Sequence, residues 1–232
     1  MILEKTILSV VITLSLNIKK LSMIAQQIEK IINTCLKYQI ENYTINPDGS
    51  IDVEGNVKLH EINLTEIPLI FNKVSGNFNC FRNKLTSLVG SPKHVGGDFY
   101  CYDNPLVSLV GCPETIIGSC YISGTPLHNL VGCPLYVGGT FSFDVSMHST
   151  FSGNTDIEIN DDIYLNISDD IDTTIRENYI SETRLPWEFI ENLNNLKLIL
   201  KYQRYFGIWN DDLSLNHENF QELLEEIKDG LL

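Results

Sequence analysis

Apolar residues recur along the middle of the chain with a fixed period of 21 residues. Counted from a leading glycine, four complete units begin at Gly55, Gly76, Gly97 and Gly118, and a fifth begins at Gly139 and then decays. The third, fifth, tenth, thirteenth and twentieth positions are mostly apolar, as in Phe99, Cys101, Leu106, Leu109 and Ile116. Such a period indicates a repeat protein, in which one unit buries its apolar side chains only by stacking on its neighbours.

The spacing within a unit predicts the shape of one coil. Apolar third and fifth positions lie two residues apart, which is typical of a short strand with one buried face, and the wider spacings that follow predict a returning segment. Stacked coils would pair these strands into one parallel sheet, with about 4.8 Å between coils. If a coil buries about five such side chains at roughly 1.5–3 kcal/mol each, it gains on the order of 10 kcal/mol before chain entropy is subtracted.

Two polar columns fit this geometry. A glycine followed two residues later by a proline predicts a tight bend on the return side, and the pairs are Gly90 with Pro92, Gly111 with Pro113 and Gly132 with Pro134. Asn83 and Asn104 occupy one column, where a buried amide could bond backbone groups of successive coils, and this ladder lapses at Ile62 and Thr125.

The stack needs a cap at each end, because open coils expose sheet edges and apolar faces. We assign the repeats to residues 55–151 and an N-terminal cap to residues 1–54. Within this cap, Leu21–Leu36 carries an apolar helical stripe, and Tyr43–Ile45 with Ile51–Val53 predict a β-hairpin. The helix and the hairpin are expected to cover the first coil.

Residues 152–232 predict an acidic C-terminal cap of strands and helices. Asp156–Ile167 alternates like one or two strands, Pro186–Phe206 reads as a helix, and Asn216–Ile227 reads as a second helix N-capped by Ser214 or Asn216. The alternative is a small enzyme or effector domain in this segment. The predicted fold class is therefore α+β, a leucine-rich-repeat-like solenoid with a parallel β-sheet and helices at both ends.

The repeat motif resembles known families. Its pattern of apolar residues, Asn, Leu, Gly and Pro is similar to the leucine-rich repeat, and Ile62–Pro68 (INLTEIP) looks like a phrase of bacterial effector repeats. Asn42–Val53 and Gly97–Pro113 resemble short-repeat proteins of large DNA bacteriophages, and the likeness covers about Glu41–Phe143. This resemblance implies a solenoid with a concave strand-lined face; its functional implication is weak, because such repeats bind many partners.

An apolar run near the N-terminus, Ile7–Leu16, bears on location. It is shorter than the roughly 20 residues of a membrane-spanning helix. It has the core of a signal peptide without a small-x-small cleavage site, and it could also belong to an upstream extension of a chain that starts at Met23. We expect a cytoplasmic protein, in the host cytoplasm if phage-encoded, with residues 1–22 leaving a secreted or membrane-anchored form as the alternative.

Charge limits the classes of partner, and cysteine content indicates the compartment. Of the 30 acidic residues, 18 lie between Phe151 and Leu232 against 6 Lys and Arg, so the net charge of -14 belongs mainly to this end. This acidic end is expected to be a solvated surface or, alternatively, a docking site for a basic partner. The chain has no Lys and Arg cluster of the kind that binds phosphates, which argues against nucleic acid. Five of the six cysteines fall inside the repeats at positions that other coils fill with Leu, Ile, Phe or Ser, which predicts free core thiols in a reducing compartment.

No sequence motif predicts catalysis, a cofactor or a metal site. The cysteines form no Cys-x-x-Cys pair, and the chain has no Gly-x-Ser-x-Gly elbow, P-loop or His-Glu-x-x-His. An acidic stretch lacks the ligand and glycine spacing of a calcium loop and reads as solvated loop residues: Asp161, Asp162, Asp169, Asp170 and Asp172.

The strongest binding candidate is the outward face of the repeat strands. If the third and fifth positions face inward, the fourth and sixth face outward, which places four rings in one patch: Phe81, Tyr100, Tyr102 and Tyr121. Lys58 and Asn79 occupy the fourth position of the preceding coils. Tyrosine gives rigid contact area with a polar end, which suits recognition of a protein or a sugar, and we predict a noncatalytic module that binds a protein partner. Alternatively, the tyrosines reflect β-propensity, a terminal segment covers them, or the chain is a surface adhesion module.

Overall fold

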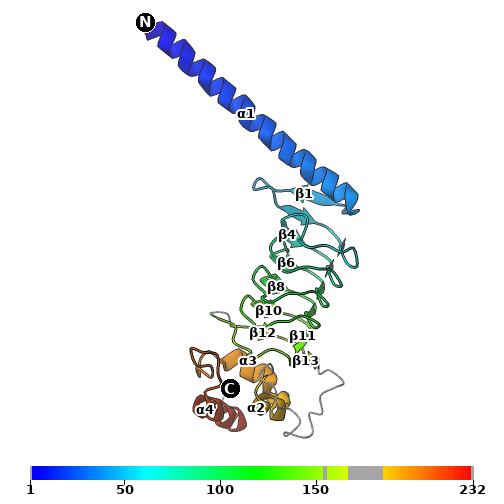
Figure 1. Cartoon of the computed structure of the whole chain (residues 1–232), viewed down its shortest axis with the longest axis vertical. Helices are drawn as coiled ribbons and strands as arrows, with labels where there is room; N and C mark the ends of the chain where they lie inside the picture. The colour runs from blue at the N-terminus through cyan, green and yellow to red at the C-terminus, as the bar shows by residue number, and fades with distance from the viewer. Residues whose placement is uncertain (1, 154–155, 167–184, 231–232) are drawn as a thin grey trace.

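The computed structural model describes residues 2–153, 156–166 and 185–230, with side chains described from residue 12 onward. Its middle is a β-solenoid of about 5 turns with coils of about 21 residues. A long helix, α1 (Ile2–Lys37), projects from one end of the stack, and shorter helices lie against the other end (Figure 1). The predicted α+β solenoid with helices at both ends is confirmed.

Each coil contributes a strand to two parallel sheets rather than one. The six-stranded sheet contains the predicted strands, in the order β13 (Ile163–Asn166), β11 (Phe141–Asp144), β9 (Cys120–Tyr121), β7 (Phe99–Tyr100), β5 (Phe78–Asn79) and β3 (Val57–Lys58). The seven-stranded sheet has the order β1 (Tyr43–Ile45), β2 (Ile51–Val53), β4 (Phe71–Val74), β6 (His94–Val95), β8 (Thr115–Ile116), β10 (Tyr136–Val137) and β12 (Glu158–Ile159).

The prediction of a single sheet was therefore wrong. The residues around the twentieth position, which we expected in a return segment, form the second sheet. The reason is the stacking itself: coils in register bring the backbone groups of both sides within hydrogen-bonding distance, as in Gly96 N–H to Val74 O at 2.8 Å. Each coil is therefore hydrogen-bonded to its neighbours on two sides.

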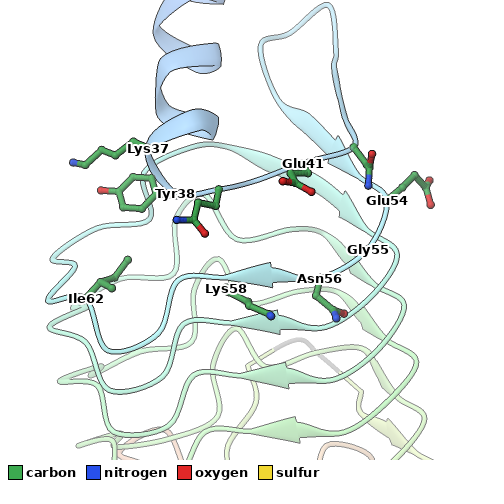
Figure 2. A pocket seen from close by; sticks show the side chains of 10 residues that line it. Lys37, Tyr38, Glu41, Glu54, Gly55, Asn56, Lys58 and Ile62 are labelled. Carbon is green, nitrogen blue, oxygen red and sulfur yellow. The ribbon is translucent and has the colours of Figure 1, made fainter.

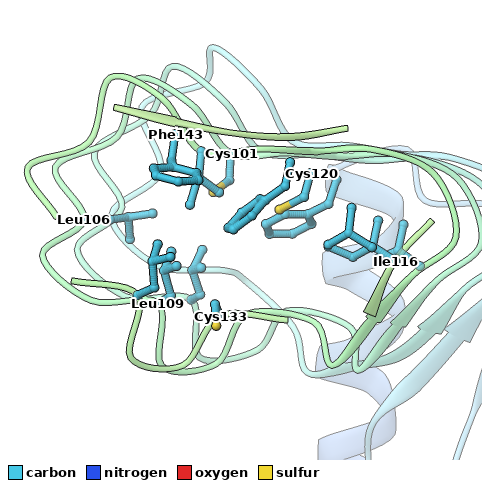
Figure 3. Close-up of a cluster of buried hydrophobic side chains, with 14 of the residues drawn as sticks. Cys101, Leu106, Leu109, Ile116, Cys120, Cys133 and Phe143 are labelled. Carbon is cyan, nitrogen blue, oxygen red and sulfur yellow. The ribbon is translucent and has the colours of Figure 1, made fainter. Parts of the chain in front are cut away.

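The predicted apolar columns fill the space between the two sheets. The third and fifth positions are fully buried from Val57 and Leu59 to Phe141 and Phe143, and the tenth, thirteenth and twentieth positions join them (Figure 3). Phe78 and Phe99 stack one coil apart, with centroids 5.8 Å apart. The cysteines are free, and those of the repeats lie in or beside this core, as predicted.

The N-terminal segment contains the helix and the hairpin that the sequence predicts. The hairpin forms from the predicted strands, β1 and β2, and β2 pairs with β4 at the end of the seven-stranded sheet. The helix covers less of the first coil than the stripe predicted: Ile31 and Cys35 are buried, but Leu21 is 66% and Leu36 is 71% exposed. The reason is that most of α1 projects away from the stack, so only its last turns pack on the solenoid.

The C-terminal cap forms from the predicted segments, with one correction. The single helix expected over Pro186–Phe206 is broken into α2 (Trp187–Glu191), a 3-10 turn (Leu193–Asn195) and α3 (Leu196–Tyr202), because asparagines at 192, 194 and 195 favour helix ends over helix interiors. The last helix, α4 (His217–Lys228), begins as predicted, with Asn216 accepting from Asn219 N–H at 3.1 Å.

The C-terminal helices pack on the end of the solenoid and extend its hydrophobic core. Leu200 and Phe220 share the buried cluster of the repeats. Gln203 is buried and accepts from the Thr150 hydroxyl at 2.8 Å and from Trp209 at 3.0 Å, which ties the cap to the last coil. Among the helices in the described part of the chain, none combines the length and apolarity needed to cross a membrane.

Candidate partner-binding face

The outward side of the six-stranded sheet carries two adjacent columns of side chains. The strand register pairs Lys58 with Asn79, Asn79 with Tyr100, and Tyr100 with Tyr121, so these four residues form one column, the tyrosine column. Two positions further along each strand lies the ring column, made of His60, Phe81 and Tyr102. The structure therefore brings together all six residues that the sequence predicted for the face.

The rings of both columns stack face to face along the solenoid axis. Phe81 lies between His60, at 4.6 Å and 10°, and Tyr102, at 4.5 Å and 9°. Tyr100 and Tyr121 stack at 5.0 Å and 5°. Each such pair contributes about 0.5–1.5 kcal/mol beyond its buried area. The stacking fixes the rings in place and directs their edges, rather than their faces, to the outside.

Asp98 holds the tyrosine column in position. One of its carboxylate oxygens accepts from the Tyr100 hydroxyl at 2.9 Å, and the other accepts from Ser119 N–H at 2.7 Å. Burial, and then the hydrogen bond to Asp98 and its negative charge, raise the pKa of Tyr100 to about 12. Tyr100 therefore keeps its proton at neutral pH and acts as a hydrogen-bonding group with a fixed direction.

Asp98 also belongs to a ladder at the second position of the coils. A side-chain oxygen of each member accepts from the backbone N–H of the next coil; the members are Asn56, Asn77, Asp98 and Ser119. The leading glycine of the following coil touches this ladder, since a Cβ at Gly97 would collide with the Asn77 side chain. The leading glycine is thus required for close approach.

A row of charges borders the ring column. Arg82 lies 3.0 Å from Glu61 and 3.2 Å from Asp103, and its guanidinium lies 6.0 Å from the Tyr102 ring. The hydrogen bonds to Glu61 and Asp103 raise the pKa of Arg82. All three charged side chains are about half exposed, so the row adds little stability and mainly gives the edge of the face a charge pattern.

An open polar groove of about 530 Å³ continues the face at its first coil (Figure 2). It lies between the end of α1 and the first coil, and Lys58 of the tyrosine column lines it together with Lys37, Tyr38, Glu41 and Glu54. The groove offers both charges and an aromatic ring. The face therefore runs from this groove along the stack to Tyr121.

Two polar atoms of the face have no hydrogen-bond partner within the described residues. They are His60 Nδ1 and Asn79 Oδ1, one in each column, and both are shielded from solvent. Buried polar atoms are usually paired, so unpaired ones need an explanation such as a missing ligand group. Because neither atom is exposed, a bound molecule could pair with them only after neighbouring side chains shift.

Sequence reasoning missed the supporting residues of this face. His60 stands one period before Phe81 in the same column, so the column pattern could have placed it in the stack. The roles of Asp98 and Arg82 depend on contacts between coils, and the sequence pattern carries no signal for them.

In the described residues, no cluster of three or more His, Cys, Asp or Glu side chains could hold a metal ion. Asp161 and Asp162 lie exposed between β12 and β13, whereas Asp169, Asp170 and Asp172 fall outside the described residues. Burial raises the pKa of the Cys80, Cys112 and Cys120 thiols, which keeps them protonated.

The evidence for the coil geometry is the structure itself. The likeness of the motif to leucine-rich repeats and to bacteriophage short-repeat proteins stays a prediction from the sequence. Comparison of the chain with protein-family models, with curated proteins and with solved structures found no match.

Proposed function

We propose that this chain is a noncatalytic binding module that holds a protein partner on the outward face of its six-stranded sheet. The observation that carries the proposal is the pair of stacked columns, in which Tyr100 with Tyr121 and Phe81 with Tyr102 form a rigid aromatic surface. Such preformed aromatic area is typical of the residues that dominate protein interfaces.

The direction of the rings favours a protein over a sugar. A sugar stacks on the open face of an aromatic ring, but both faces of Phe81 are covered by His60 and Tyr102. Ring edges and the hydroxyls of Tyr102 and Tyr121 remain, and these suit apolar side chains and backbone carbonyls of a protein. The unpaired His60 Nδ1 and Asn79 Oδ1 add a polar requirement that a partner backbone could meet once neighbouring side chains shift.

The protonation states support a role without catalysis. A nucleophile or general base needs a pKa near the working pH, and the environments of one tyrosine and of the buried thiols move their pKa values upward, away from it. Tyr100 has its pKa raised to about 12, and burial raises the pKa values of the Cys80 and Cys120 thiols. These groups are held in the forms that pack and donate hydrogen bonds.

The motif resemblance suggests the setting. If the likeness to bacteriophage short-repeat proteins reflects origin, the partner is a protein of the infected host cell, met in the cytoplasm.

The test is affinity capture from the native cell with three versions of the full chain. Replacing both Tyr100 and Tyr121 by Ala removes the stacked pair and should reduce recovery of the partner at least tenfold. A matched control, Val89→Ala with Val110→Ala, trims two exposed apolar residues of the return segments, which are 68% and 57% exposed, and should leave recovery unchanged.

Folding has to be separated from binding. The double variant loses the stacking, about 0.5–1.5 kcal/mol, together with the area that the two half-buried rings cover, so it should keep its far-UV circular dichroism and unfold at a lower Tm. Equal partner recovery by the wild type and the tyrosine variant would reject this face as the binding site.

A further inference from the structure

The part of α1 before Ile31 is exposed wherever the structure describes its side chains. Every residue from 12 to 30 is exposed, and burial begins only at Ile31 (Figure 1). An isolated helix in water is marginal, and helices in proteins are stabilised mainly by packing an apolar face. The exposed residues of this stretch include large apolar side chains, namely Ile12, Leu14, Leu16, Ile18, Leu21, Met23, Ile24 and Ile28.

Part of this exposed surface follows a seven-residue repeat. Alternating steps of four and three residues link a set of apolar positions, here called the seam: Leu14, Ile18, Leu21, Ala25, Ile28 and Ile32. The same spacing continues in the sequence to Val11 and Ile7. In heptad terms, Ile18, Ala25 and Ile32 take position a, and the others take position d. A seam of this kind, sustained over about four heptads, is the signature of a coiled coil.

The seam meets the surface that packs on the solenoid only at the end of α1. At about 100° per residue, Ile31 lies roughly a quarter turn round the helix from the centre of the seam, whereas buried Cys35 continues position d one heptad after Ile28. Lys19 and Lys20 occupy positions b and c, on the side away from the seam. Because the seam is exposed from Leu14 to Ile32, a second helix can approach this stretch without burying a lysine.

The composition of the seam favours a second copy of the same helix. A parallel coiled coil of two helices is favoured by β-branched residues at position a, as at Ile18 and Ile32, and by leucine at position d, as at Leu14 and Leu21. An apolar side chain carries about 60–120 Å² of surface, so twelve seam residues from two helices could bury roughly 700–1,400 Å². This range reaches the size of stable interfaces, about 1,200 Å² and above, before flanking positions are counted.

We propose that α1 pairs with α1 of a second copy through the seam, as a parallel and in-register two-stranded coiled coil. The inference is independent of the proposed function, although it would place two partner-binding faces on one particle and increase avidity for a multivalent partner.

The experiment is the mass of the full chain in solution, measured by light scattering and sedimentation velocity over a range of concentrations. The wild type should have twice the mass of the 26.3 kDa chain. Ile18→Glu with Leu21→Glu, which places two charges in the seam, should reduce it to the single-chain mass. Leu16→Glu with Met23→Glu should leave the pair intact.

The two variants are matched in exposure and chemistry. Ile18 and Leu21 are 67% and 66% exposed, and Leu16 and Met23 are 61% and 62% exposed on the other side of the helix. Far-UV circular dichroism of both variants monitors folding. A wild type that stays monomeric at all concentrations, or equal dissociation by both variants, would overturn the proposal.

Two further measurements test the register of the helix pair and the alternative that α1 binds a lipid surface. Leu14→Cys should form a cross-linked dimer on mild oxidation, because equivalent d residues meet in a parallel pair, whereas Leu16→Cys should not. Binding of a monomeric wild type to vesicles of phosphatidylcholine and phosphatidylglycerol, reduced by both glutamate pairs, would assign this helix to a lipid surface and contradict the proposal.

Discussion

At the scale of single residues, buried amides connect the coils. The Asn104 amide donates to Cys80 O at 3.0 Å and to Cys101 O at 2.9 Å, and its oxygen accepts from Leu85 N–H at 3.1 Å. Asn83 makes the equivalent bonds one coil earlier. At Thr125, where the ladder was predicted to lapse, the hydroxyl donates only to Ile122 O at 2.7 Å. Asparagine is therefore the residue that links neighbouring coils at this corner.

Replacing Asn104 by Val should lower the free energy of unfolding by about 2–4 kcal/mol, because it leaves buried backbone groups without partners. Asn79→Val is the matched control: it removes an amide whose oxygen has no partner and adds a β-branched side chain on a strand, so stability should stay the same or increase. Urea denaturation measures both, and similar losses in the two variants would contradict this role for Asn104.

The core thiols make stability depend on pH in the alkaline range. Burial raises the pKa values of Cys112 and Cys133 in the folded chain. A thiol of the unfolded chain loses its proton above about pH 8.5, while the folded chain keeps it, so unfolding becomes more favourable as pH rises. At pH 9.5 each thiol that the fold keeps protonated should cost up to about 1.4 kcal/mol of stability relative to pH 7.5, and partly exposed Cys112 should contribute less than buried Cys133.

Serine provides the control for this prediction, because Ser91 fills the same repeat position as Cys112 and Cys133. The double variant Cys112→Ser with Cys133→Ser should lose less stability between pH 7.5 and 9.5 than the wild type. Urea midpoints at the two pH values measure the difference, and an identical loss in both chains would show that these thiols are not the cause.

At the scale of elements, the sequence predicts those whose pattern extends over several residues or coils. The hairpin, the strands of the six-stranded sheet and the buried columns follow directly from apolar spacing. The repeat strands of the other sheet carry one buried column, as at Val95 of His94–Val95, so no pair of apolar positions two residues apart marks them in the sequence. The break between α2 and α3 was missed because apolar spacing continues across Leu193 and Leu196.

The candidate binding face also has a part that the sequence predicted and a part that it did not. The alternation along each strand placed Phe81, Tyr100, Tyr102 and Tyr121 on one face, and the structure confirms this placement. The stacking of His60, the anchoring of Tyr100 by Asp98 and the charges around Arg82 arise from contacts between coils. Such contacts depend on the exact register of the stack, which one sequence does not supply.

At the scale of the whole molecule, the solenoid is a row of similar coils closed by two caps. Each coil pairs its backbone with the coils before and after it in both sheets, as β7 does with β5 and β9. Stability in such an array is approximately a sum over coils and the contacts between neighbours. A whole coil should therefore be removable, and a fraction of a coil should not.

The most direct test of this account deletes residues 97–117, one complete coil, and compares the product with a chain lacking residues 97–107, about half a coil. The first deletion joins Gly96 to Gly118 and keeps every column in register, so the shorter chain should still unfold cooperatively, at a lower temperature. The second shifts the buried columns out of register and should abolish the cooperative transition in circular dichroism. Loss of folding in both chains, or retention in both, would contradict a stack of interchangeable 21-residue coils.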